Sequence, residues 1–388
     1  MNIAAGRCRC RCLRRQSCYV ISVYAATVIL LQNCLIAYHA ATRGDPSDAT
    51  IVTGGVDHAP TASTVPPRSA VTSSSIVVPL AVVAARPTAQ QSQQQQHRPG
   101  PPLTEKEYYS RRPHKVNEFR HQSVLVPDRL CQPGAFMVIL VHSSPTNLDR
   151  REAIRVTWGN AVVNGTWPDG TKLSRLYLAF VLGLHADDSV NRAVREEHAR
   201  HNDIIQGDFV DNYRNMTLKS LFDLKMVETH CPGVQYLIKS DDDMIINLPY
   251  LVDILAARPL TSSFMGPYNP RSRVFRDGVW KLTSEEFPFN FYPPYESGSA
   301  YIITGDLIHE LFVTAEYVPH IFVDDVYVTG ILGRILGVSH VRHSGFAYWG
   351  TRTPTACDIV RRTIVTGTKM HPQRLCALWN DLRLNPKC

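Results

Sequence analysis

Three continuous apolar segments constrain the fold of this 388-residue chain more than any other feature. They are Ala135–His142, Arg175–Leu182 and Val234–Lys239. Unbroken apolar runs of this length are typical of strands that are buried on both faces of a parallel sheet. Segments of helical character alternate with them, and a short strand is expected at Ile204–Ile205. The helical segments are Asn147–Trp158, which Asn147 is expected to cap, Ser189–His201 and Thr217–Thr229. This alternation predicts an α/β fold with a mostly parallel central sheet.

Three consecutive carboxylates, Asp241, Asp242 and Asp243, directly follow the third apolar segment. In an open α/β sheet, ligands bind at the carboxyl ends of the strands. Clustered carboxylates repel one another, and a divalent cation shared with substrate phosphates would relieve that repulsion. The triplet therefore predicts a metal site for a nucleotide diphosphate. A solvated acidic turn is the alternative, but the apolar residues on both sides of the triplet favour the metal site.

A second acidic pair, Asp324 and Asp325, opens the segment Val326–Leu336, which has helical character. Carboxylates near a helix start are favoured by the helix dipole, so simple capping is one interpretation. The other is a general base that removes the proton from an attacking hydroxyl. The local sequence alone leaves both interpretations open.

Arg150, Arg151 and Arg155 lie in or beside the first predicted helix. The planar guanidinium group suits phosphate, and Arg151 and Arg155 share one helix face. A solvated surface, paired with Asp149 and Glu152, is an equally good interpretation of the same pattern.

The N-terminal region predicts a membrane anchor. Residues 1–18 contain five arginines and no acidic residue, and residues 19–38 carry no charged side chain. The uncharged run has about the length of a membrane-spanning helix, and the arginines before it predict a cytoplasmic tail at 1–18. A cleaved signal peptide is the alternative. Residues 39–130 are rich in Ser, Thr, Pro, Ala and Gln, which predicts a flexible stem ahead of a folded domain at 131–388.

Two further patterns suit a domain on the far side of a membrane. Asn164 and Asn215 each begin an N-x-[ST] glycosylation triplet. Beyond the anchor, five cysteines remain, and in an oxidising compartment most should pair: Cys131, Cys231, Cys357, Cys376 and Cys388.

The distribution of charge argues against a nucleic-acid-binding protein. The net charge of the whole chain is +7, but residues 131–388 carry 26 basic and 27 acidic side chains. A basic groove for nucleic acid is therefore not expected in the folded domain.

Six sequence blocks occur in one order along the chain. They are FMVILVHSSPTNLDRREAIRVTWG (Phe136–Gly159), FVLG (Phe180–Gly183), DIIQGDFVDNYRNMTLKSL (Asp203–Leu221), YLIKSDDDMIIN (Tyr236–Asn247), YPPYESGSAYIIT (Tyr292–Thr304) and DDVYVTGIL (Asp324–Leu332). Together they resemble the β1,3-galactosyltransferase family, glycosyltransferase family 31, which also includes β1,3-N-acetylglucosaminyltransferases. The resemblance covers roughly residues 131–385.

This resemblance implies a GT-A-like fold in a type II Golgi membrane protein with a lumenal catalytic domain. It also implies an inverting transfer of a sugar from a UDP-sugar to a hydroxyl. Asp325 would be the general base and Asp243 would bind Mn²⁺, with His343 or His371 as a further ligand. The other matching positions would lie on the donor side: Ser143, Ser144, Arg150, Arg151, Arg155, Lys239, Asp241 and Asp242.

The chain departs from the family pattern at two places. Glu296 stands where galactosyltransferase-like members often have cysteine, which would leave Cys357 without its partner unless Cys376 or Cys388 replaces it. A carboxylate there would also lie near the acceptor side and would change acceptor choice. The family's VYVG becomes VYVTG, and the extra residue is expected to shift the helix register after Asp325 without moving the base.

The sequence thus predicts a β1,3-galactosyltransferase that uses UDP-galactose and extends a glycan on a glycoprotein or glycolipid. A β1,3-N-acetylglucosaminyltransferase that uses UDP-GlcNAc and a non-catalytic Golgi glycan-binding protein are the alternatives. Retention of the acidic triplet and Asp325 argues against the non-catalytic alternative.

Overall fold

The computed structural model describes residues 104–348, 350–384 and 386–388. The predicted cytoplasmic tail, anchor and most of the predicted stem lie outside these residues. Within the described part of the chain, no helix combines the length and the apolar character needed to cross a membrane.

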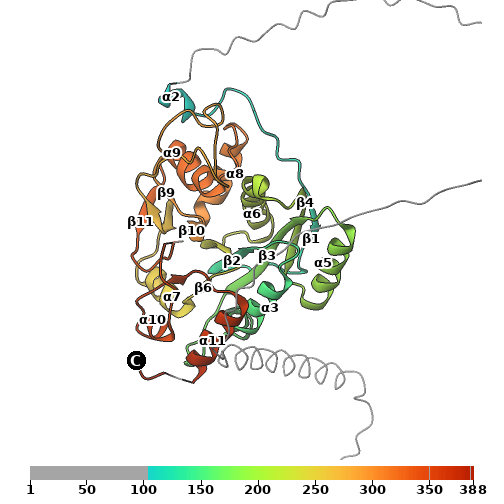
Figure 1. Cartoon of the computed structure of the whole chain (residues 1–388), viewed down its shortest axis with the longest axis vertical. Helices are drawn as coiled ribbons and strands as arrows, with labels where there is room; N and C mark the ends of the chain where they lie inside the picture. The colour runs from blue at the N-terminus through green and yellow to red at the C-terminus, as the bar shows by residue number, and fades with distance from the viewer. Residues whose placement is uncertain (1–103, 349, 385) are drawn as a thin grey trace, which may run out of the picture. The chain divides into compact units, whose positions relative to one another are not determined.

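An eight-stranded sheet, with strand order β1-β4-β3-β2-β5-β10-β7-β11, forms the centre of the domain (Figure 1). The four strands from β4 to β5 are parallel, whereas β1 and β10 run antiparallel to their neighbours. The predicted α/β fold with a mostly parallel sheet is confirmed. The strands are β1 (Ser123–Leu125), β2 (Met137–His142), β3 (Leu176–Leu184), β4 (Ile204–Val210), β5 (Tyr236–Asp241), β7 (Ser263–Gly266), β10 (Ala300–Thr304) and β11 (Ser339–Arg342).

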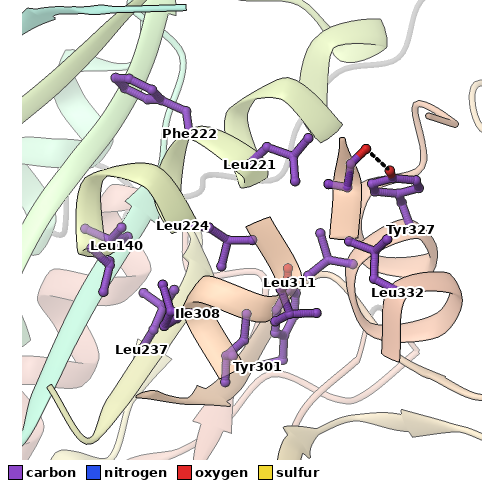
Figure 2. Close-up of a cluster of buried hydrophobic side chains, with 14 of the residues drawn as sticks. Leu140, Leu221, Phe222, Leu224, Leu237, Tyr301, Ile308, Leu311, Tyr327 and Leu332 are labelled. Atoms are coloured by element: carbon purple, nitrogen blue, oxygen red, sulfur yellow. Dashed lines mark hydrogen bonds between the residues drawn. The ribbon is translucent and has the colours of Figure 1, made fainter. Parts of the chain in front are cut away.

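Helices cover both faces of this sheet, with α6 and α8 on one face and α3 and α11 on the other (Figure 1). Alternate residues of β2 face the two layers, because successive side chains of a strand point to opposite sides. The first core joins Val138 and Leu140 to α6 and α8 (Figure 2), and the second joins Ile139 to α3 and α11. The helices are α2 (Glu105–Tyr108), α3 (Leu148–Val156), α4 (Trp158–Asn164), α5 (Asp188–His201), η1 (Tyr213–Asn215), α6 (Met216–His230), α7 (Leu248–Ala257), η2 (Gly305–Leu307), α8 (Ile308–Ala315), η3 (Val326–Leu332), α9 (Gly333–Leu336), α10 (Ala356–Val360) and α11 (Pro372–Arg383).

Two short strand pairs lie beside the main sheet. β6 (Ile245–Ile246) pairs with β12 (Thr366–Gly367) directly after the acidic triplet, and β8 (Tyr268–Asn269) pairs with β9 (Tyr295–Glu296). These pairs fix the chain on both sides of the carboxyl edge of β5.

The predicted helix after Asp325 begins as a π-helix, η3, and continues as α9. A π-helical turn contains more residues per hydrogen-bonded ring than an α-helical turn, so it accommodates an extra residue. The hydroxyl of Thr329 donates to the backbone carbonyl of Asp325 at 2.7 Å. The predicted helical segment is thus present, and Asp325 lies at its start; the register shift expected from an extra residue stays a prediction.

The folded domain begins earlier than residue 131, which corrects the predicted boundary with the stem. Tyr108 of α2 is buried against Phe287 and Phe289, and β1 pairs with β4. The side chain of Asn117 donates to the backbone carbonyls of Ala315 and Val318. Low-complexity composition concealed these contacts because each involves only a few residues.

Two disulfides join distant parts of the domain, Cys131–Cys231 and Cys357–Cys388. The second bond confirms one of the two partners predicted for Cys357. Cys376 is buried in the core between α11 and the sheet.

Candidate functional site

The carboxyl ends of β2 and β5 form the edge at which most of the predicted site residues lie. The two strands are parallel neighbours, and His142 is in register with Asp241. The chain passes from β2 outward to β3 and β4, and then returns to place β5 on the other side of β2. Ligands of open α/β sheets bind at such a switch point.

Asp242 is the best-anchored carboxylate of the triplet. It accepts hydrogen bonds from the Ser143 hydroxyl at 2.7 Å, the Asn147 amide at 2.9 Å and the Arg150 guanidinium at 2.9 Å. All three donors come from the loop after β2 or the start of α3. Asn147 occupies the predicted N-cap position of α3, but its side chain makes no cap bond and binds Asp242 instead. Asn147 is thus a site residue that sequence reasoning missed. Ser144 lies in the same loop and is only partly exposed.

Arg151 and Arg155 do not face the site with free guanidinium groups, which corrects the predicted phosphate contacts. Arg151 is fully buried and forms a two-pronged pair with Glu197 at 2.8 and 2.6 Å. Its remaining nitrogens donate to the carbonyls of Ser144 and Pro145 and to a hydroxyl of the same loop. Arg155 is engaged by Asp203, Glu197 and Glu152. The two arginines therefore support the loop after β2 from behind.

Lys239 connects the triplet to the second acidic pair. Its buried ammonium donates to the Asp241 carboxylate at 2.7 Å and to the Gly298 carbonyl at 2.6 Å, and lies 4.0 Å from the Asp324 carboxylate. Burial alone would lower the pKa of Lys239, but Asp241 and Asp324 outweigh it and raise that pKa. Lys239 therefore stays charged and contacts protein groups.

Asp241 keeps 40% of its side-chain surface exposed although it is the last residue of the buried strand β5. Desolvation raises the pKa of Asp241, and Lys239 opposes this rise. Since the carboxylate is well exposed, solvent screens part of both effects. Asp241 is thus open to a ligand, whereas Asp242 is buried.

Asp325 lies at the start of η3 and is partly buried. One carboxylate oxygen accepts the Gly298 N–H at 2.8 Å, and the other accepts the Val326 N–H at 2.7 Å. Desolvation and the neighbouring charge of Asp324 raise the pKa of Asp325 to about 7, against the opposing effects of the two N–H groups and Lys239. A carboxylate with such a pKa suits proton transfer near neutral pH.

Residues 296–299, called the bridge segment below, join the triplet to Asp325. The Gly298 N–H reaches Asp325, the Gly298 carbonyl reaches Lys239, and the Ser299 carbonyl accepts the Asp241 N–H at 2.9 Å. A side chain at position 298 would place its Cβ 3.2 Å from the Asp325 carboxylate, so glycine allows the close approach. The antiparallel strand β10 carries this segment to the carboxyl edge of β5.

Glu296 is fully buried, which contradicts the predicted carboxylate on the acceptor side. It pairs with His340 and packs between β7, β11 and η3 instead of facing solvent. Its character as a charged residue suggested exposure, and only the three-dimensional arrangement shows the buried partner.

Asp243 is the predicted metal ligand, and its surroundings favour His371 over His343 as a neighbour. The Met370 N–H donates to the Asp243 carbonyl at 2.8 Å, and His371 follows at the start of α11. Desolvation raises the pKa of Asp243, while the charges of Arg150 and His371 lower it. Burial lowers the pKa of His343, whose Nδ1 accepts the Gly345 N–H.

The donor chemistry at Asp243 suits a hard divalent cation. Among residues 104–348, 350–384 and 386–388, no group of three or more His, Cys, Asp or Glu side chains is arranged to hold a metal ion. Mg²⁺ and Mn²⁺ are commonly bound by one or two carboxylates, with substrate phosphates and water completing the shell. Asp243 and Asp241 are only partly buried and provide oxygens of this kind.

An exposed group of aromatic side chains, called the aromatic rim below, lies beside the second acidic pair and was missed by sequence reasoning. It consists of Tyr213, Phe275 and Trp280. The Trp280 indole N–H donates to the Tyr213 hydroxyl, and the Phe275 and Trp280 rings are 5.7 Å apart.

Contacts of η1 and α6 place the rim near Asp325. Arg214 lies over the Phe322 ring at 4.1 Å, Thr217 donates to the Ile321 carbonyl, and Ser220 donates to Asp324 at 2.8 Å. These contacts hold η1 and the start of α6 against residues 321–324, directly before Asp325. The rim residue Tyr213 immediately precedes this series.

The two predicted glycosylation positions differ in their surroundings. Asn164 is exposed at the end of α4, and its amide donates to the Asn160 side chain. Asn215 is partly buried and its amide donates to the Val210 carbonyl at 2.9 Å. Glycosylation of either position stays a prediction.

Comparisons with known proteins identify one family. The Galactosyltransferase family profile matches residues 149–344. The chain is 32% identical over 253 residues to Beta-1,3-galactosyltransferase 1 from Mus musculus and from Homo sapiens, covering 64% of this chain and 74% of each relative. It is 29% identical over 268 residues to Beta-1,3-galactosyltransferase 2 from Homo sapiens, covering 67% of this chain and 61% of that relative.

Solved structures show a more distant likeness. The galactosyltransferase LgtC in complex with donor and acceptor sugar analogs is 14% identical, with a TM-score of 0.30 over 64% of this chain and 94% of that one. The bifunctional glycosyltransferase WbbM in its apo form is 10% identical, with a TM-score of 0.31 over 53% of this chain and 38% of that one. At these scores nothing further rests on the two structures.

Proposed function

From the membership of this chain in the galactosyltransferase family, as a hexosyltransferase, we propose its reaction. It transfers galactose from UDP-galactose to a sugar hydroxyl of a glycan and forms a β1,3 linkage with inversion. The fold would be of the GT-A type. The observation that carries the proposal is the convergence of the acidic triplet and Asp325 on one bridge segment. It supports a donor side and a proton-accepting side within one site.

In the proposed reaction, an acceptor hydroxyl attacks the anomeric carbon of the donor sugar. The new oxygen–carbon bond forms as the bond to the diphosphate oxygen breaks, and UDP leaves with the bonding electrons. Asp325 accepts the hydroxyl proton, because its pKa of about 7 makes it a stronger base than an ordinary carboxylate. The transition state has oxocarbenium character, as in glycoside hydrolysis.

The donor side of the site would position the nucleotide sugar. Asp242 is fixed by the loop after β2, and Asp241 and Asp243, on either side of it, are only partly buried. Mn²⁺, when held by Asp243 together with the diphosphate, would offset the negative charge that develops on the leaving group. Arg150 pairs with Asp242 of the triplet and keeps its side chain partly exposed, so it is available to a donor phosphate.

We also propose a type II Golgi membrane protein with the catalytic domain in the lumen. Support comes from the arginine-rich residues 1–18, the uncharged run at 19–38 and the disulfides of the folded domain. Disulfides persist in oxidising compartments such as the secretory pathway.

A donor panel tests the proposed function. The secreted domain from residue 104 onward is incubated with Mn²⁺, glycan acceptors and labelled UDP-galactose or UDP-GlcNAc. Transfer of galactose with a β1,3 product linkage is expected. Transfer from UDP-GlcNAc alone would favour the N-acetylglucosaminyltransferase alternative, and UDP-sugar binding without transfer would favour the non-catalytic one.

The aromatic rim provides a platform for the acceptor. The face of a pyranose ring packs well on an exposed aromatic side chain, and aromatic contacts contribute about 0.5–1.5 kcal/mol beyond area burial. Replacing Trp280 by alanine is therefore expected to raise the KM for acceptor about three- to tenfold. Initial rates at varied acceptor and saturating donor measure this effect.

Two controls make this test specific. Trp280→Phe keeps an aromatic face but loses the N–H bond to Tyr213, so it should retain most of the acceptor affinity. Val163→Ala removes apolar surface from an exposed side chain of α4, away from the site, and should leave both KM values unchanged. An equal rise in donor and acceptor KM for Trp280→Ala would exclude the acceptor platform.

A further inference from the structure

Glu296 is a buried carboxylate whose side chain has a single hydrogen-bond partner among the described residues. One of its oxygens lies 2.9 Å from Nδ1 of His340, whose side chain is 15% exposed. Its second oxygen, Oε2, is buried and has no hydrogen-bond partner among the described residues. A buried charge in this setting is costly unless its partner stays in place. The Glu296–His340 pair therefore restrains the relative positions of β9 and β11.

Groups from each neighbouring element define the electrostatic surroundings of Glu296. Burial raises its pKa, while His340 and Arg342 of β11 lower it. From β8, the Tyr268 ring lies 5.2 Å from the His340 ring and 4.3 Å from the Arg342 guanidinium carbon. From η3, the Thr329 hydroxyl accepts the Glu296 N–H at 2.9 Å. The pair thus lies between positive charge on one side and the π segment on the other.

Glu296 is also the first residue of the bridge segment, so a change in its position would reach Asp325 over a few bonds. The Ser297 N–H donates to the Pro267 carbonyl at 3.0 Å, and the next residue, Gly298, delivers its N–H to Asp325. The Thr329 hydroxyl connects the Glu296 N–H to the Asp325 backbone carbonyl. Two short paths therefore link the buried pair to the two ends of the proposed base, its backbone and its carboxylate.

We propose that Glu296 and His340 are positioning residues for the proposed base. The hydrogen bond between them anchors the bridge segment so that the Gly298 N–H meets the Asp325 carboxylate in the geometry that favours its ionised form. The inference rests on the proposed function, because it assigns Asp325 the role of proton acceptor. Glu296 is fully buried behind the segment, so its role in this proposal is to position Asp325.

The test compares pH profiles of two variants with that of the unmodified domain. Glu296→Gln keeps the shape of the side chain but replaces the carboxylate by an amide, and His340→Gln keeps a hydrogen-bond donor without the imidazole ring. In each variant the Gly298 N–H is expected to bind Asp325 less well, which disfavours the ionised carboxylate. The acidic limb of kcat/KM should therefore move upward by about one pH unit, with kcat/KM about tenfold lower at pH 6.5.

A second His–Glu pair provides a matched control. His309 and Glu228 join α8 to α6 at 2.5 Å on the surface, outside the site. His309→Gln should leave the acidic limb unchanged. Thermal melting of all variants separates lost stability from lost positioning.

Each outcome decides the inference. An upward shift of the limb in His340→Gln, with the control unshifted, supports it even if Glu296→Gln fails to fold. A lower Tm with an unshifted limb assigns the pair a purely structural role and overturns it, as do unchanged variants. Absence of sugar transfer by the unmodified domain would instead refute the proposed function, and this inference with it.

Discussion

Replacing Asp325 by asparagine is expected to lower kcat by roughly 10²–10⁴-fold, the range typical of a lost general base. The amide has nearly the same shape and can keep one contact with the Gly298 or Val326 N–H, but it cannot accept the acceptor proton. UDP-sugar binding should persist, because the triplet and its anchoring donors are unchanged. Single-turnover transfer and calorimetric UDP titration measure the two quantities separately.

The ionisation of Asp325 determines in which direction kcat/KM changes with pH. Because the pKa of Asp325 is raised to about 7, the fraction of ionised base decreases as the pH falls below that value. The kcat/KM of the unmodified domain should fall in parallel, and the remaining activity of Asp325→Asn should lack this limb. Asp253→Asn, at an exposed carboxylate of α7, should behave like the unmodified domain. Full activity of Asp325→Asn would assign the proton transfer to another group.

Replacing Asp243 by alanine is expected to weaken cation-dependent UDP-sugar binding by about 100-fold or more, because it removes a charged oxygen ligand at the proposed metal position. The Asp243 backbone carbonyl still accepts the Met370 N–H in the variant, so the loop should keep its conformation. Titration of Mn²⁺ in the presence of UDP measures the change.

Asp381→Ala removes an exposed carboxylate of α11 and should leave the Mn²⁺ titration unchanged. An unaltered titration in Asp243→Ala as well would exclude Asp243 as a ligand. A parallel test of His371→Ala and His343→Ala distinguishes the two histidines, since only His371 interacts electrostatically with Asp243.

The sequence predicted the buried parallel strands well because their signal is local. β2, β3 and β5 lie within two residues of the predicted segments, since a strand buried on both faces is apolar throughout. β4 extends from Ile204 to Val210, beyond the predicted pair of isoleucines. Gln206 and Gly207 conceal it, although the Gln206 side chain is buried and donates to the Gly183 carbonyl.

Only part of the site could be predicted from the sequence, because some of its contacts join residues that are far apart along the chain. The triplet is visible because three acidic residues follow a strand, and their position at its end follows from the parallel sheet. The engagement of Arg151 by Glu197 and the burial of Glu296 beside His340 each join elements more than forty residues apart. A single sequence contains no local signal for such pairs, and charge alone suggested solvent or ligand as the partner.

The bond between Cys131 and Cys231 has a consequence for how the domain unfolds. It joins the chain just before β2 to the chain just before β5, across a separation of 100 residues. Closing a loop of that length costs an unlinked chain about 4.7 kcal/mol in conformational entropy. With the bond formed, β2 and β5 stay close even when the outer strands and helices open. The two strands that bring Ser143 to Asp242 therefore stay close to their native pairing. After partial unfolding, the carboxyl ends of β2 and β5 can come together again without a search through the whole chain.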